Sequence, residues 1–171
     1  MKKNKSSEIL ESAIDIILDR GPSAFTLREL SKKAEVSLGA INYHFLSKGT
    51  LYKKLIAYVS EKLLVLSSFE IDEEKDANEN MIMLLKRINK LFIEHKREIR
   101  SFLVLKIHAQ TYPTYQPYFT DVEKRVEKCL SDIANLDDSY STEMLKYKFW
   151  SAVFYSFLVL NEEIKLEHMG F

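Results

Sequence analysis

The residues best suited to binding another molecule are gathered in the segment SLGAINYHF, residues 37–45. This segment is rich in small residues and hydrogen-bonding groups, and its only ionisable side chain near neutral pH is His44. Gly39 costs about 1 kcal/mol inside a helix relative to alanine. We interpret the glycine as an adaptation for close approach, because a helix backbone without a Cβ can lie close to another surface.

Lys48 follows in the first turn of the next predicted helix, where the helix dipole disfavours a cation. The placement becomes favourable if the free N–H groups of that helix start share a phosphate with the lysine. The alternative is a solvated surface charge, which is the commoner fate of a single lysine. We favour the phosphate because Arg28, Tyr43 and His44 lie on the same short unit.

The sequence contains no pattern for catalysis or metal binding. None of the four histidines has a glutamate three residues before it, which excludes the paired Glu-x-x-His ligands of di-iron bundles. His-Glu-x-x-His, a cysteine pair for zinc, a glycine-rich phosphate loop and Gly-x-Ser-x-Gly are also absent. We therefore predict no catalytic residue, no metal, no cofactor and no enzymatic activity. The alternative, an enzyme built on a helical bundle, would need a bound metal or cofactor.

Three helix starts position the segment. In each, an apolar residue precedes Ser or Thr and a second follows four residues after it, which combines an N-cap hydroxyl with a hydrophobic staple. The three sets are Phe25-Thr26 with Leu30, Val36-Ser37 with Ile41, and Leu46-Ser47 with Leu51. Glu29 completes a capping box at the first. The first two helices can be only about two turns long, and the turn Ala34-Glu35-Val36 joins them into a helix-turn-helix.

This stretch, Phe25 to Tyr52, resembles the DNA-binding region of the TetR (tetracycline-repressor) family of bacterial transcription regulators. The matching pieces are Thr26-Leu27-Arg28, Val36-Ser37, Gly39-Ala40-Ile41, Tyr43-His44-Phe45 and Ser47-Lys48. Three positions depart from the family pattern. Glu35 stands where the family usually has Gly, Gly49 where an acidic residue is common, and Asn42 where Tyr is frequent.

The resemblance implies that residues 37–44 enter the major groove of DNA. Leu38, Ala40 and Asn42 would then lie near base edges, and Asn42 could pair with adenine. The side chains that would hold phosphates, and set the register without reading sequence, are Thr26, Arg28, Tyr43, His44 and Lys48. The full predicted DNA-binding set is Thr26, Arg28, Ser37, Leu38, Gly39, Ala40, Asn42, Tyr43, His44 and Lys48.

The charge distribution agrees with one polyanion-binding end. The chain has no net charge, but residues 1–55 hold ten basic against six acidic residues and the remainder carries the compensating negative charge. One cysteine, Cys129, suits a reducing cytosol. We recognise no signal peptide and no membrane-spanning run of about 18–20 apolar residues, so we expect a cytoplasmic protein.

The remaining segments predict an all-α fold. We expect a first helix over residues 6–20 that ends at Gly21-Pro22, and a long helix from residue 47 to about 66. An acidic loop over 67–78, interpreted as a solvated connector, separates this part from helices over about 79–96, 98–111, 118–134 and 142–168. These boundaries predict a helix-turn-helix domain, 1–50, and a helical ligand-binding and dimerisation domain, 51–171.

The last helix is apolar nearly all round from Phe149 to Leu160, so it must be covered on most sides. It lies in the middle of the body or packs against a second copy. The family pairs its C-terminal helices into a dimeric four-helix bundle, and the 118–134 helix is the candidate second member here.

Fifteen of the twenty aromatic residues lie from Phe69 onward. They can line a pocket for an effector, as the resemblance implies, or simply fill a core. The candidate ligand contacts are Phe102, Lys106, Tyr147, Trp150 and Phe154. The leading interpretation is therefore a homodimeric, ligand-responsive repressor that binds a pseudo-palindromic operator in double-stranded DNA. The alternative is a helical interaction module with the same fold that does not bind DNA.

Overall fold

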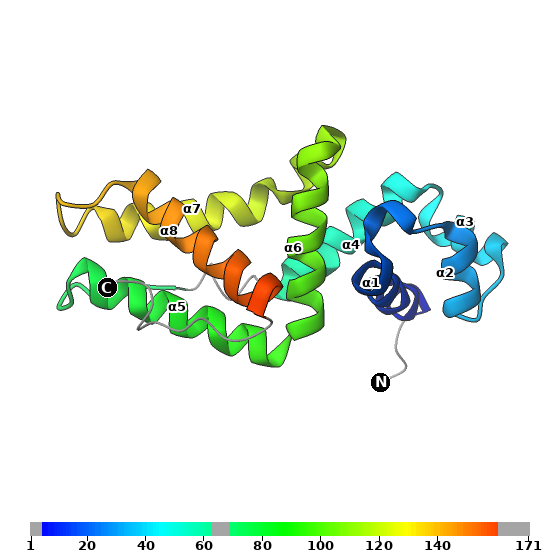
Figure 1. Ribbon diagram of the computed structural model, residues 1–171, viewed down its shortest axis with the longest axis horizontal. Coiled ribbons are helices and arrows are strands. Elements are labelled where there is room, and N and C mark those ends of the chain that lie inside the picture. Colours follow the sequence, from blue (N-terminus) through cyan, green and yellow to red (C-terminus); the bar gives the residue numbers. More distant parts are fainter. Residues whose placement is uncertain (1–4, 63–68, 161–171) are drawn as a thin grey trace. The chain divides into compact units, whose positions relative to one another are not determined.

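A computed structural model describes residues 5–62 and 69–160 of the chain. Every regular element in these two ranges is a helix, which confirms the all-α prediction (Figure 1). The chain divides into two compact units. One takes Met1–Glu61 together with Arg97–Phe119, and the other takes Lys62–Lys96 together with Thr120–Phe171.

The first unit is built around a small head of four helices. α1 is broken at Gly21, whose φ of 77° lies in the left-handed region, so the predicted stop is confirmed. The predicted inward face of α1 is buried together with residues of the next three helices. The four helices are α1 (Lys5–Ala24), α2 (Leu27–Lys33), α3 (Leu38–Phe45) and α4 (Lys48–Lys62). Figure 1 shows α2 beside α1 and α3 beside α2.

All three predicted caps are present. The amide of Glu29 donates to Thr26 Oγ1 at 3.2 Å, and the amide of Ala40 donates to Ser37 Oγ at 3.0 Å. Thr50 donates its amide to Ser47 Oγ at 3.1 Å. The predicted capping box at Thr26 is present only in part. The Thr26 hydroxyl accepts the Glu29 amide, but the Glu29 carboxylate pairs with Arg20 at 2.7 Å.

The first unit also contains α6 (Lys96–Thr111) and the 3₁₀ helix η2 (Pro113–Phe119), which is the segment predicted as a proline turn. Arg97 at the start of α6 forms ion pairs with Glu11 and Asp15 of α1. Tyr52 of α4 is buried, and its ring meets Tyr115 of η2 edge-on at 5.1 Å. These contacts group α6 and most of α4 with the head in one compact unit.

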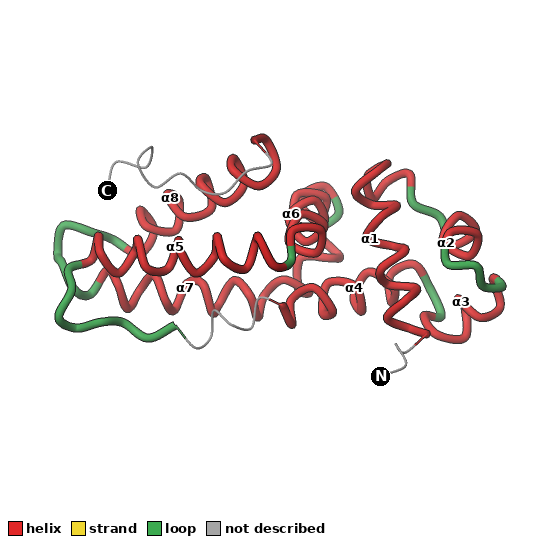
Figure 2. Tube along the Cα trace, turned by 90° about the horizontal axis from the view of Figure 1, so that it is seen from below, coloured by secondary structure: helices red, strands yellow, loops and turns green. Residues whose placement is uncertain are grey.

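The described part of the second unit, residues 69–96 and 120–160, is a helical bundle (Figures 1 and 2). It contains α5 (Ala77–Glu94), α7 (Thr120–Ala134) and α8 (Thr142–Phe154), and the chain continues as the π-helical turn η3 (Tyr155–Leu160). α7 packs against both α5 and α8. Phe92 of α5 stacks on Phe157 of η3 with 3.9 Å between the ring centroids. The predicted ends of two helices, near Leu66 and His168, lie outside the described residues.

The acidic loop before α5 is anchored, which corrects its interpretation as a purely solvated connector. The amide group of Asn80 is fully buried and donates to the carbonyls of Asp72, Lys75 and Asp76 at 3.0–3.1 Å. Its oxygen accepts the amide of Asp72 at 2.9 Å. One side chain therefore satisfies four backbone groups of the loop, and a capping box between Asp76 and Glu79 starts α5.

Candidate nucleic-acid interface

α3 packs with one face inward and presents the other to solvent. Ile41 and Phe45 are buried, whereas Leu38, Gly39, Asn42 and Tyr43 are exposed. The exposed residues recur at the spacing of one helix face. Tyr43 is 82% exposed. The predicted residues Ala40 and His44 are half-buried at the edges of this face, and Ser37 is exposed at its N-terminal end, where it caps the helix.

Gly39 is not required by the packing of the chain itself. A Cβ built at this position would meet only Ser37 Oγ, at 3.6 Å, which is an ordinary contact. Alanine would therefore fit, and it would favour the helix by about 1 kcal/mol. The missing side chain leaves open space on the outer face of α3, as expected where another backbone must approach closely.

The turn between α2 and α3 places Glu35 in the left-handed region, with φ of 52°. The amide of Val36 closes the turn by donating to the Ser31 carbonyl at 3.0 Å. A left-handed residue at this point explains the glycine of the family pattern, because glycine adopts positive φ without steric cost. Glu35 is exposed, so its carboxylate remains in water.

Two predicted phosphate contacts lie at the start of α2. Thr26 is exposed, and its hydroxyl oxygen already caps the helix. Arg28 is exposed in the first turn. These two side chains are therefore accessible from solvent on the head that carries the outer face of α3.

Lys48 occupies a more enclosed position than the sequence predicts. Its ammonium donates to the Phe25 carbonyl at 2.8 Å and to the Pro22 carbonyl at 3.4 Å. It also lies 5.7 Å from the ring centre of Phe25 and 5.4 Å from that of Tyr52, and burial lowers its pKa. Lys48 thus braces α4 against the segment between α1 and α2, and two of its three N–H donors are directed at carbonyl oxygens.

Tyr52 and His108 add further contacts between the α1–α2 segment, α4 and α6. The Tyr52 hydroxyl donates to the Pro22 carbonyl at 2.6 Å, and burial raises its pKa. The ring of His108 on α6 lies edge-on to Tyr52, with 6.3 Å between centroids. Burial, and then the nearby charge of Lys48, lower the pKa of His108. The head is therefore tied to α6 by an aromatic cluster that the sequence analysis did not identify.

Lys54 is a second residue that the sequence analysis missed. Its ammonium donates to the His44 carbonyl near the C-terminal end of α3 at 2.7 Å. A cation at that end is favourable because the last carbonyls of a helix carry partial negative charge. Local sequence offers no signal for this contact, since it joins residues of different helices.

The five predicted ligand contacts separate into two groups that belong to different compact units. Phe102 and Lys106 of α6 are buried and meet at Phe119, whose ring centroid lies 5.1 Å from that of Phe102 and 5.6 Å from the Lys106 ammonium. Trp150 and Phe154 of α8 lie 5.7 Å apart, whereas Tyr147 is 76% exposed.

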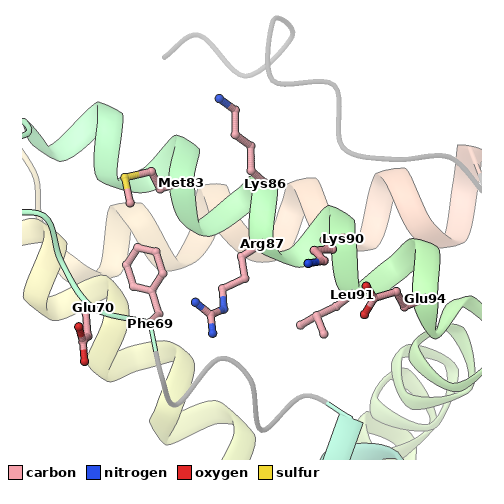
Figure 3. A pocket seen from close by; sticks show the side chains of 8 residues that line it. All are labelled: Phe69, Glu70, Met83, Lys86, Arg87, Lys90, Leu91 and Glu94. Atoms are coloured by element: carbon pink, nitrogen blue, oxygen red, sulfur yellow. The ribbon is translucent and has the colours of Figure 1, made fainter.

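A pocket of about 710 Å³ lies elsewhere, beside α5 (Figure 3). None of the five predicted contacts is among the residues that line it: Phe69, Glu70, Met83, Lys86, Arg87, Lys90, Leu91 and Glu94. Met83, Arg87, Lys90, Leu91 and Glu94 recur at helical spacing, which is the signal in the sequence that could have pointed to this face.

Among residues 5–62 and 69–160, no three His, Cys, Asp or Glu side chains are grouped so that they could hold a metal ion. Within the same ranges, no helix has both the length and the apolar character needed to cross a bilayer.

Comparison with known proteins gives a family match in the head. Residues 9–55 match the family described as bacterial regulatory proteins, tetR family. The nucleoid occlusion factor SlmA of Vibrio cholerae is 33% identical over 103 residues, which cover 60% of this chain and 52% of SlmA. The chain thus spans about half the length of the curated relatives it matches.

Solved structures show the same fold over nearly the whole chain. The multidrug binding protein EbrR, complexed with ethidium, superposes with a TM-score of 0.70 at 18% identity, covering 97% of this chain and 94% of EbrR. A transcriptional regulator from Aquifex aeolicus gives 0.65 at 23% identity, covering 97% and 93%. The N-terminal region, residues 9–55, is thus that of the tetR family of bacterial regulatory proteins, and the chain shares its fold with these solved structures.

Proposed function

We propose that this protein is a homodimeric transcription repressor whose binding to an operator in double-stranded DNA is controlled by a small effector. The observation that carries the proposal is the outer face of α3, where Gly39 leaves open space beside exposed hydrogen-bonding residues. A helix of this kind fits the major groove, because small residues let the backbone approach the base edges.

The proposed contacts lie on the outer face of α3, at its edges, or at the start of α2. Leu38, Ala40 and Asn42 read base edges, with Asn42 paired to adenine, and Ser37 and Gly39 allow the close approach. Thr26, Arg28, Tyr43 and His44 hold phosphates and fix the register. Lys48 was predicted to join them, but its hydrogen bonds to Phe25 and Pro22 support a positioning role in the head instead.

The proposed dimer uses α8. Met144 and Tyr147 are exposed on α8 and Tyr155 at the start of η3, which follows it, and Tyr147 and Tyr155 are 76% and 56% exposed. Large aromatic side chains on an open helix face are typical of surfaces that another protein covers. α7, which packs against α8, is the proposed second member of the interface. Replacing Tyr147 by Asp should shift the protein toward monomer in sedimentation equilibrium, whereas Tyr43→Asp, on α3, should leave the oligomeric state unchanged.

The DNA proposal is tested by selecting bound duplexes from a random pool and then titrating the selected duplex. Asn42→Ala should cost about 1–3 kcal/mol on the selected duplex and relax the preference at one base pair. Arg28→Gln should weaken binding to all duplexes and lower the salt slope by about one. If wild-type protein binds selected and scrambled duplexes with equal, salt-insensitive affinity, the proposal fails.

The competing function is a helical interaction module that recognises a protein and not DNA. Exposed apolar side chains on the head favour it, since Tyr43 and Leu46 are 82% and 79% exposed. Glu35 is also exposed on the head, and its carboxylate would repel a polyanion. Titration of mixed duplex DNA at low and high salt separates the two, because a polyanion-binding head loses affinity steeply as salt rises.

A further inference from the structure

The pocket beside α5 combines apolar walls with a group of cations. Phe69, Met83 and Leu91 supply the apolar surface, and Leu91 is buried. Lys86, Arg87 and Lys90 supply three positive charges within five residues of one helix. Figure 3 shows Phe69, from the loop before α5, and Arg87, from α5, extending into the same space.

The charges of the lining are unequal. Two carboxylates, Glu70 and Glu94, also line the pocket, and both are exposed. Arg87 is less exposed than either of the two lysines. An arginine partly withdrawn from water, one helical turn from Met83 and from Leu91, is suited to binding a carboxylate, sulfonate or phosphate group with two parallel hydrogen bonds.

We propose that this pocket is the effector site and that it takes an organic anion, a molecule with one acidic group on an apolar or aromatic body. The inference rests on the proposed ligand response. The acidic group lies against Arg87 and Lys90, and the body lies against Phe69, Met83 and Leu91. A volume of about 710 Å³ is within the range of pockets that hold drug-sized molecules. An organic cation is disfavoured, because three positive charges outweigh the two exposed carboxylates.

The test uses two dyes that share the same rings. Anilinonaphthalene sulfonate carries one negative charge, and phenylnaphthylamine lacks it. Both fluoresce when they enter apolar surroundings, so their affinities can be measured on the full chain without DNA. We expect the sulfonate to bind at least about tenfold more tightly than the neutral dye, because it gains a charge-assisted pair with arginine. Ethidium serves as the cationic comparison.

Three variants locate the site. Lys90→Gln should weaken the sulfonate about two- to fivefold, as expected for a charge that is exposed to solvent. Arg87→Met should weaken it about tenfold or more. Neither should change the affinity for phenylnaphthylamine. Lys128→Gln, an exposed lysine of α7 outside the lining, is the matched control and should change nothing. Because Lys90 is exposed, its replacement leaves the fold intact even if Arg87→Met does not.

Equal affinities for the two dyes, a preference for ethidium, or an equal loss in Lys128→Gln would each overturn the proposal. DNA binding is measured separately and without dye. A protein that binds the sulfonate as expected but no DNA would refute the proposed function and leave the anion site standing. A protein that binds DNA but shows none of the dye pattern would refute the anion site alone. When both hold, the sulfonate should release the selected duplex and phenylnaphthylamine should not.

Discussion

Replacing Glu35 by glycine should stabilise the head, and the size of the effect follows from its backbone. Glu35 has φ of 52°, in the left-handed region. This conformation costs a residue with a side chain about 1–2 kcal/mol. Glycine avoids that cost but loses about 0.5–1 kcal/mol more conformational entropy on folding. The net expectation for Glu35→Gly is a gain of roughly 0.5–1 kcal/mol in the free energy of unfolding.

The variant Glu35→Gln separates the effect of backbone strain on stability from the effect of the side-chain charge. Glutamine keeps the left-handed strain and removes the carboxylate, so we expect its stability to equal that of wild type. Urea denaturation followed by far-UV circular dichroism gives the global value, and amide hydrogen exchange in α2 and α3 gives the local one. Gly21→Ala is the reciprocal control, since Gly21 has φ of 77°, and it should destabilise the protein.

The same pair of variants tests the placement of the turn near DNA. Both should bind DNA more tightly than wild type, because both remove a negative charge from the proposed interface. Only Glu35→Gly should also be more stable. If Glu35→Gly is no more stable than Glu35→Gln, the positive φ carries no strain and the explanation of the family glycine is wrong.

Three other predictions concern the head and its brace. Lys48→Met should lower the free energy of unfolding in urea by about 1–2 kcal/mol, because it removes the charged donor of two carbonyls. It should leave the salt slope of DNA binding unchanged, in contrast to Arg28→Gln. A slope that falls by one would show that Lys48 contacts a phosphate after all. Gly39→Ala should raise helix stability by up to about 1 kcal/mol, measured by thermal unfolding. It should also weaken DNA binding, measured by fluorescence anisotropy. Unchanged DNA affinity would contradict the close approach of α3 to DNA. Since burial and Lys48 lower the pKa of His108, the unfolded chain binds a proton more readily. The contribution of His108 is therefore complete above about pH 6.5 and is lost as the pH falls through its folded pKa. His108→Gln should reduce the difference in the free energy of unfolding between urea titrations at about pH 7.5 and 5.5. An unchanged difference would contradict the lowered pKa of His108.

The parts of the fold that depend on neighbouring residues were predictable from the sequence. The hydroxyls of Thr26, Ser37 and Ser47 cap helices within three residues of themselves, so spacing alone finds them. Gly21-Pro22 ends the helical part of α1 for a similarly local reason. The capping box of Asp76 and Glu79 depends on equally local spacing, although it lies within an acidic segment.

The parts that depend on distant residues were not predictable. Lys48 meets carbonyls 23 and 26 residues before it, and no local pattern shows whether a lysine turns toward its own chain or toward a partner. Asn80 looks like one polar residue of an acidic stretch, yet it is the anchor of the preceding loop. For the ligand candidates, apolar periodicity identifies residues that face inward, but it does not distinguish a filled core from the wall of a pocket.

The position of Tyr52 has a practical consequence for anyone who wishes to study the DNA-binding end in isolation. A fragment truncated after α4 would leave one edge of this buried ring without Tyr115 and His108, its neighbours from a part of the chain more than fifty residues further on. Limited proteolysis near the end of α4 should therefore not release an independently stable piece. Domain exchanges between relatives would do better to transplant α6 and η2 along with the first four helices.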